Sequence, residues 1–194
     1  MKIVFNLLLI CMLIFLTNSL KLESKSQSKI KQKPLNEYYT LHFQHSGKCI
    51  DVEGNQLHDG AKVLQYDCHG GDNQKFLLQY NSDDNTYYIV NKHSGKVLDI
   101  PWPHNTSMPI HQWSLWFGVN QKWILDQTNT GHFRIRSKFT DGSSGKGWCL
   151  QVERIVITMS ITASSPYNLA KVVNAPCSDS EPGQRIGLVL VETN

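Results

Sequence analysis

The sequence predicts an all-β fold built from three similar units, and two observations support this prediction. One phrase occurs twice, as HSGKCIDV at 45–52 and as HSGKVLDI at 93–100, and a third Ser-Gly-Lys stands at 144–146. The three Ser-Gly-Lys copies are offset by 48 and 50 residues, so the chain repeats with a period near 48. Between turn residues such as Gly, Asn, Asp and Pro lie short alternating or apolar runs, which are typical of strands.

Each unit contains four of these runs. They are YYTLHFQ, CIDV, KVLQY and KFLLQY in the first unit, TYYIV, VLDI, IHQW and KWILD in the second, and HFRIR, WCLQV, KVV and IGLVLV in the third. Three four-stranded units that are each too small to bury their own apolar face predict a pseudo-threefold β-trefoil around one core. A propeller has units of similar length, but three blades are too few to close its ring. The expected repeats span about 38–84, 85–130 and 131–194.

The third repeat is degenerate and contains an insertion between its middle strands. The inserted segment, RIVITMSITASSPYNL at 154–169, is rich in β-branched residues. Such residues favour extended structure, so we expect an additional hairpin in this segment rather than disorder.

The N-terminus predicts a secreted, extracellular protein. Lys2 precedes an apolar run from Ile3 to Leu16, and small residues follow up to Ser19, as in a secretory signal peptide spanning 1–19. The run is short for a bilayer span, and no other stretch reaches the length that a transmembrane helix needs. Residues 20–37 are rich in Lys and Ser and lack an apolar period, which indicates a tail or linker before a folded domain at 38–194.

The charge distribution argues against a nucleic-acid partner. The tail contains five Lys and two Glu, whereas residues 38–194 contain 13 basic and 14 acidic side chains. A folded part near neutrality lacks the basic patch that phosphate backbones require.

Four cysteines remain after the signal peptide, an even number that predicts two disulfides in an oxidising compartment. Three pairings are possible, and sequence separation favours Cys49 with Cys68 and Cys149 with Cys177. The sequence contains neither a Cys-x-x-Cys motif nor a Cys/His cluster with zinc-finger spacing, so we expect no structural zinc site. Asn105 begins an Asn-Thr-Ser sequon, which predicts N-glycosylation in a eukaryotic secretory pathway.

The repeated motifs resemble those of the ricin-type β-trefoil lectins. The phrase Cys-x-Asp-Val opens the first unit's motif, and QYDCHGGDNQKF at 65–76 ends in the Asn-Gln-x-aromatic signature that returns at 120–123. A degenerate third copy of the signature, Gln-Arg-Ile, lies at 184–186. The resemblance covers essentially all of 38–194, although its third repeat departs from the pattern.

This resemblance implies two sugar sites. A pyranose needs an aromatic plate for its C–H face, a carboxylate that accepts from neighbouring hydroxyls, and an amide that donates and accepts. The matching residues are Asp51, Tyr66 and Asn73 in the first repeat and Asp99, Trp113 and Asn120 in the second. His69 and Trp116, each three residues after the plate, are candidates to extend the sites or to pack on the surface.

Two points about these residues stay open in the sequence. We include Gln74 and Gln121 in the carbohydrate-binding set, but we interpret them first as structural residues, together with the aromatic residues that follow them and close the core. Asp51 and Asp99 have the alternative of accepting hydrogen bonds from local turn backbone.

The third repeat lacks the pattern, with Gln151, Ala175 and Gly183 at the three positions, so we expect no sugar site there. Neither HExxH nor GxSxG occurs in the chain, and nothing else indicates catalysis or a cofactor. We therefore predict a non-enzymatic lectin that binds glycans on cell surfaces, glycoproteins or polysaccharides.

The resemblance makes galactose or N-acetylgalactosamine the leading ligand class, because an Asp that accepts from the 3- and 4-hydroxyls suits an axial 4-hydroxyl. Xylan-type and other glycans remain open. The alternatives are a β-trefoil protease inhibitor that uses the insertion 154–169, or a glycan-targeting subunit that joins a separate toxin or glycosidase.

Overall fold

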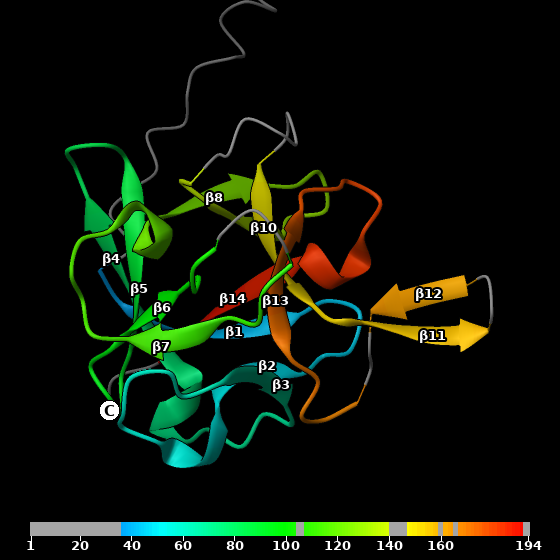
Figure 1. The fold of residues 1–194 in the computed structure, drawn as a ribbon, viewed down its shortest axis with the longest axis horizontal. Helices are drawn as coiled ribbons and strands as arrows, with labels where there is room; N and C mark the ends of the chain where they lie inside the picture. Colours follow the sequence, from blue (N-terminus) through cyan, green and yellow to red (C-terminus); the bar gives the residue numbers. More distant parts are fainter. Residues whose placement is uncertain (1–35, 104–106, 140–146, 159–160, 165–166, 192–194) are drawn as a thin grey trace, which may run out of the picture. The chain divides into compact units, whose positions relative to one another are not determined.

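The computed structural model describes residues 36–103, 107–139, 147–158, 161–164 and 167–191 (Figure 1). The expected signal peptide, nearly all of the expected tail, the Asn105 sequon and the third Ser-Gly-Lys lie outside these residues. Two residues of the expected tail are described and bind to strand β4: Asn36 Oδ1 accepts from the Tyr80 amide at 3.2 Å, and the Glu37 carbonyl accepts from the Leu78 amide at 3.4 Å. No helix in the described part of the chain is long and apolar enough to cross a membrane.

Each repeat contributes four strands, as the sequence predicted. The first repeat forms β1 (Tyr38–Phe43), β2 (Cys49–Val52), β3 (Val63–Tyr66) and β4 (Lys75–Asn81). The second repeat forms β5 (Thr86–Asn91), β6 (Val97–Asp99), β7 (His111–Trp113) and β8 (Trp123–Gln127). The third repeat forms β9 (Phe133–Ser137), β10 (Trp148–Val152), β13 (Val172–Pro176) and β14 (Ile186–Leu190).

The insertion forms the additional hairpin, β11 (Arg154–Thr158) and β12 (Ile161–Ser164), which pair only with each other as a separate two-stranded sheet (Figure 1). The helical segments among the described residues are short 3-10 turns: η1 (Glu53–Asn55), η2 (Asp72–Gln74), η3 (Val119–Gln121) and η4 (Pro182–Gln184).

Six strands close into a ring, which removes the exposed edges of an open sheet. Their order around the ring is β1, β4, β5, β8, β9 and β14, and β1 completes it by pairing with β14 from Tyr39–Leu190 to Phe43–Ile186. The other six strands form three hairpins, β2–β3, β6–β7 and β10–β13. This arrangement confirms the predicted β-trefoil.

All three repeats bury side chains in one common core. The residues that close the Gln-x-aromatic signature, Phe76, Trp123 and Ile186, are fully buried. The indole N–H of Trp123 donates to the Leu98 carbonyl at 3.1 Å, so the largest of these side chains leaves no polar atom unpaired. The apolar residue is therefore structural in each repeat.

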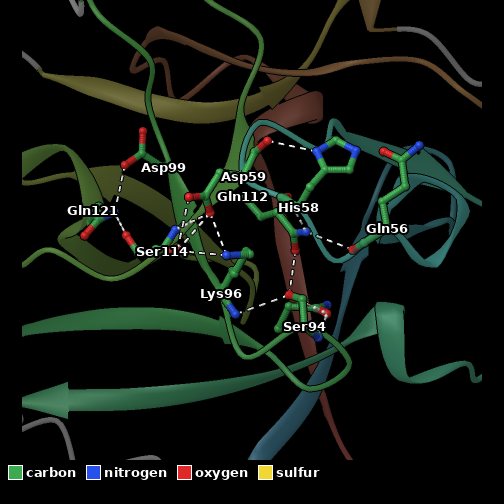
Figure 2. Close-up of polar contacts among 10 residues, drawn as sticks. Gln56, His58, Asp59, Ser94, Lys96, Asp99, Gln112, Ser114 and Gln121 are labelled. Atoms are coloured by element: carbon green, nitrogen blue, oxygen red, sulfur yellow. Dashed lines mark hydrogen bonds and ion pairs between the residues drawn. The ribbon is translucent and has the colours of Figure 1, made fainter.

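A buried amide on the middle hairpin of each repeat binds the loop of another repeat. In the second repeat, Gln112 Nε2 donates to the carbonyls of Gln56 at 2.8 Å and His58 at 3.1 Å, both in the first repeat (Figure 2). Gln112 Oε1 accepts from Ser94 Oγ at 2.6 Å, which holds the amide in this orientation (Figure 2).

The other two middle hairpins also bind a loop of another repeat through a buried amide, as a donor in one case and as an acceptor in the other. Gln65 Nε2 of the first repeat donates to the Tyr167 carbonyl of the third repeat at 2.7 Å. Asn174 Oδ1 of the third repeat accepts from the Met108 amide of the second repeat at 2.6 Å. Each repeat therefore positions a loop of its neighbour beside its own middle hairpin.

Both expected disulfides are present, Cys49–Cys68 and Cys149–Cys177. Each lies within one repeat, because it joins the second strand of that repeat to the residues just after its third strand. The second repeat folds to the same topology without a disulfide.

We predict that the double change Cys149→Ala and Cys177→Ala lowers the free energy of unfolding by about 3 kcal/mol, since the bond closes a loop that spans a sequence separation of 28 residues. Chemical denaturation under non-reducing conditions measures this loss. Peptide mapping of the native protein provides the control, and a peptide that joins Cys49 to Cys149 or Cys177 would contradict the repeat assignment.

Candidate functional site

Three side chains hold the buried carboxylate of Asp99 at the end of β6. Oδ2 accepts from Asn120 Nδ2 at 3.0 Å and from Gln121 Nε2 at 2.9 Å. Oδ1 lies 3.0 Å from His111 Nε2, and the β6–β7 register places His111 directly opposite Asp99. These contacts fix the orientation of the carboxylate before any ligand binds.

Exposed aromatic rings surround this carboxylate. A cavity of about 190 Å³ has Asp99, His111 and Asn120 among its polar lining residues. Its aromatic walls are Trp102, Trp113 and Trp116, and their relative exposures are 79%, 40% and 58%. The ring centroids of His111 and Trp113 are 5.2 Å apart with an angle of 32° between the planes, so His111 supports the ring of Trp113.

The corresponding carboxylate of the first repeat belongs to Asp51, which is also buried. Asp51 Oδ2 accepts from Gln74 Nε2 at 2.8 Å and lies 3.3 Å from His69 Nε2. Burial raises the pKa of Asp51, and the hydrogen bond from Gln74 opposes that effect. The partners of both carboxylates are side chains of other segments, not the local turn backbone that the sequence left open.

The first cavity is larger than the second, with a volume of about 350 Å³. Asp51, Tyr66, His69 and Asn73 line it, and Tyr66 is 36% exposed. The rings of Tyr66 and His69 meet edge to face with centroids 6.1 Å apart. Leu169 of the third repeat also lines this cavity, so its wall does not come from one repeat alone.

At each site a glycine lies two residues before the asparagine of the Asn-Gln-x-aromatic signature, and an aromatic or imidazole ring packs directly against its backbone. A Cβ on Gly118 would lie 2.2 Å from the ring of Trp116, and a Cβ on Gly71 would lie 2.7 Å from the ring of His69. Neither approach is possible for a residue with a side chain. His69 and Trp116 therefore occupy equivalent places, and each lines the cavity of its repeat.

Both asparagines present an acceptor that has no partner in the structure. Asn73 Nδ2 donates to the Val52 carbonyl at 3.0 Å, and Asn120 Nδ2 donates to Asp99 and to the Ile100 carbonyl. Among the described residues, Asn73 Oδ1 and Asn120 Oδ1 are buried and accept no hydrogen bond. A buried acceptor in this state needs a partner, and both asparagines line the cavities.

Gln74 and Gln121 do not line either cavity and are fully buried. Gln121 Nε2 donates to Asp99 and to the Ser114 carbonyl (Figure 2), while its Oε1 accepts from the Trp116 amide. These glutamines therefore position the aspartates and the loops of the site. Their burial agrees with the structural interpretation, and their place in the carbohydrate-binding set stays a prediction.

The third repeat preserves the architecture without the charge. Gln151 occupies the place of the aspartate and accepts from Gln184 Nε2 at 2.8 Å. Ala175 pairs with Cys149 just as Tyr66 pairs with Cys49, and Gly183 takes the place of the asparagine. This repeat therefore lacks the carboxylate, the plate and the amide together.

Eight cavity residues were missing from the sequence-based set: Glu53, Gly54, Asn55, Leu64, Pro101, Trp102, His111 and Leu169. For His111 a signal existed, because it lies two residues before Trp113 on the same strand and therefore on the same face. For Trp102 and Leu169 no repeat pattern was available, since both lie in loops whose sequences differ between repeats.

His42, Cys49 and Cys68 form a group that could hold a metal by residue type and distance. The two cysteines are bonded to each other in the disulfide, so they offer no thiolate to an ion.

A family model described as a ricin-type beta-trefoil lectin domain-like domain matches residues 29–113. The comparison with curated protein sequences found no match. Among solved structures, the chain is similar to ThreeFoil, a designed threefold symmetric protein, with 32% sequence identity and a TM-score of 0.68. That alignment covers 79% of this chain and 99% of ThreeFoil.

Natural proteins show the same fold. The ricin B-like lectin of Macrolepiota procera, solved in complex with lactose, has 16% identity and a TM-score of 0.62, and the alignment covers 82% of this chain and 99% of the lectin. The exo-β-1,3-galactanase of Clostridium thermocellum has 22% identity and a TM-score of 0.68. The alignment covers 80% of this chain but only 30% of the galactanase. The family match, the threefold architecture and the designed relative agree, and the chain belongs to the ricin-type β-trefoil lectin domain-like family.

Proposed function

We propose that the protein is a secreted, non-enzymatic lectin that binds glycans of the galactose or N-acetylgalactosamine type through one site in each of the first two repeats. The observation that supports this proposal best is the same at both sites: a buried, side-chain-held carboxylate lies beside an unpartnered asparagine oxygen and an exposed aromatic ring. The family match and the lactose complex of the fungal lectin favour sugars of this class.

Each element of the second site has a distinct role toward a pyranose. The face of Trp113 packs against the apolar C–H face of the sugar. The Asp99 carboxylate accepts from two adjacent hydroxyls, and these charge-assisted hydrogen bonds are stronger than those between neutral groups. Asn120 Oδ1 accepts from a further hydroxyl, which gives this buried oxygen the partner that it otherwise lacks.

The sites are shallow, so each one alone binds a monosaccharide weakly, with a dissociation constant near the millimolar range, which corresponds to about 4 kcal/mol. Two sites on one rigid fold engage a glycan-dense surface together, and their combined affinity exceeds that of either site. A targeting role beside a separate catalytic or toxic protein fits the same geometry, because the chain aligns with 17% of a mosquitocidal holotoxin and 30% of the galactanase.

We predict that Asp99→Ala weakens galactose binding at the second site by about 1.5–3 kcal/mol, because two sugar hydroxyls lose their charged acceptor. Gln151→Ala is the matched control at the equivalent position of the third repeat, and it should leave binding unchanged. Calorimetric titration of both variants, after each is shown to melt like the native protein, measures the difference. An equal loss in the two variants would show that the aspartates are not the sugar contacts.

We predict that the second site binds galactose more tightly than the first, because Trp113 offers a larger plate than Tyr66 and His111 replaces the apolar Leu64 opposite the carboxylate. Titration of the Asp51→Ala variant reports the second site, and titration of Asp99→Ala reports the first. If the Asp99→Ala variant binds galactose more tightly than the Asp51→Ala variant, the ranking is wrong. If the double variant, Asp51→Ala with Asp99→Ala, still binds galactose normally, the assignment of both sites is wrong.

We predict that the first site loses its ligand on acidification at a pH above the ordinary pKa of an aspartate. Burial raises the pKa of Asp51, and only its ionised form accepts from two hydroxyls, so binding is complete above this pKa and falls as the pH drops through it. Titrations of the Asp99→Ala protein between pH 7 and pH 4 measure the midpoint. A midpoint at or below the ordinary aspartate value would refute the prediction.

A further inference from the structure

Each of the two sites has a loop of another repeat beside it. Leu169, at the end of the insertion in the third repeat, lies beside the first site, and Gly60 of the first repeat lies at the matching position beside the second site. The Leu169 amide donates to the Gln65 carbonyl at 2.9 Å, and the Gly60 amide donates to the Gln112 carbonyl at 2.9 Å. Both residues have a positive φ, 65° for Leu169 and 82° for Gly60. Leu169 and Gly60 therefore occupy equivalent positions in the fold.

A leucine in this conformation is strained, whereas a glycine is not. The loop holds it there because the Tyr167 carbonyl accepts from Gln65 and Asn168 Nδ2 donates to Asp67 Oδ2 at 2.8 Å. Leu169 also remains 58% exposed instead of joining the core. A strained, exposed apolar residue at the rim of a ligand cavity points to a role in that cavity.

The equivalent position faces the aromatic plate. A Cβ on Gly60 would lie 3.8 Å from the ring of Trp113, whereas Leu169 has a full side chain and lines the first cavity together with Tyr66. The first cavity is nevertheless the larger one, about 350 Å³ against about 190 Å³. The first site therefore has more space, and at this matched position it has an apolar side chain that the second site lacks.

The two sites differ at a second matched position. Glu53 follows Asp51 by two residues and lines the first cavity, whereas Pro101 follows Asp99 by two residues and lines the second. The Glu53 carboxylate lies 3.8 Å from Lys62 Nζ, so this ion pair is loose and the carboxylate can accept from a ligand N–H. Pro101 offers no side-chain acceptor.

We propose that Leu169 and Glu53 make the first site selective for 2-acetamido sugars. An acetamido group needs an apolar contact for its methyl group and an acceptor for its N–H. Leu169 and Glu53 supply both at the first site, whereas Gly60 offers no apolar side chain and Pro101 no side-chain acceptor at the matched positions of the second site. The inference rests on the proposed lectin function. It gives the third repeat, which lacks a site of its own, a specificity role in the site of the first repeat.

The test uses the Asp99→Ala protein, in which the first site alone is intact, and compares its affinities for N-acetylgalactosamine and galactose. The change Leu169→Gly relieves the backbone strain, and Leu169→Asn retains a residue that tolerates a positive φ while it removes the apolar wall. Both changes should lower the ratio of the affinity for N-acetylgalactosamine to the affinity for galactose about fourfold, as expected for the loss of one methyl contact. Glu53→Ala should lower the same preference.

Three outcomes overturn the inference. If the Asp99→Ala parent binds both sugars equally, or if both Leu169 variants retain its full preference, the specificity role is wrong while the lectin function stands. If the parent binds neither sugar although it melts like the native protein, the first site itself is wrong and the inference fails with it. Thermal melting of each variant separates these results from loss of the fold.

Discussion

One buried glutamine in each repeat links the fold to the site. Gln74, Gln121 and Gln184 are fully buried, and each accepts from the backbone of the loop that precedes it and donates to the side chain at the aspartate position. The same side chain therefore satisfies buried backbone groups and orients the side chain at the aspartate position. A buried polar group without partners costs about 1–3 kcal/mol, so this glutamine is constrained even where the site is lost.

The third repeat illustrates that constraint. Gln184 retains all of its contacts, but its partner is Gln151, a neutral amide, instead of a carboxylate. Burial of a carboxylate is unfavourable unless its environment stabilises the charge, and the first repeat shows that cost as a raised pKa of Asp51. In the third repeat the Gln151 amide accepts from the same glutamine, and it does so without the cost of burying a charge.

The shared core also makes the sites composite. Because no repeat buries its apolar face alone, the three middle hairpins meet, and a buried amide of each binds the loop of its neighbour. Loops whose sequences differ between repeats therefore lie beside the aromatic residues: Gly60 lies near Trp113, and Leu169 lines the same cavity as Tyr66. A loop of one repeat can therefore vary beside the cavity of the next, as Leu169 does beside Asp51, while the carboxylate, plate and asparagine of that cavity remain in register.

The sequence by itself determined the three repeats, the twelve strands, the additional hairpin and the relative positions of Asp51, Tyr66 and Asn73 and of Asp99, Trp113 and Asn120. It could do so because these features follow from strand periodicity and from a motif repeated at constant spacing within one unit. Only the tertiary structure revealed that Asp51 lies beside His69 whereas Asp99 lies beside His111, and that Leu169 lines the site of the first repeat. Leu169 is 118 residues from Asp51 in the chain, and no local pattern reports a contact that arises only when the hairpins of different repeats pack together around the threefold axis.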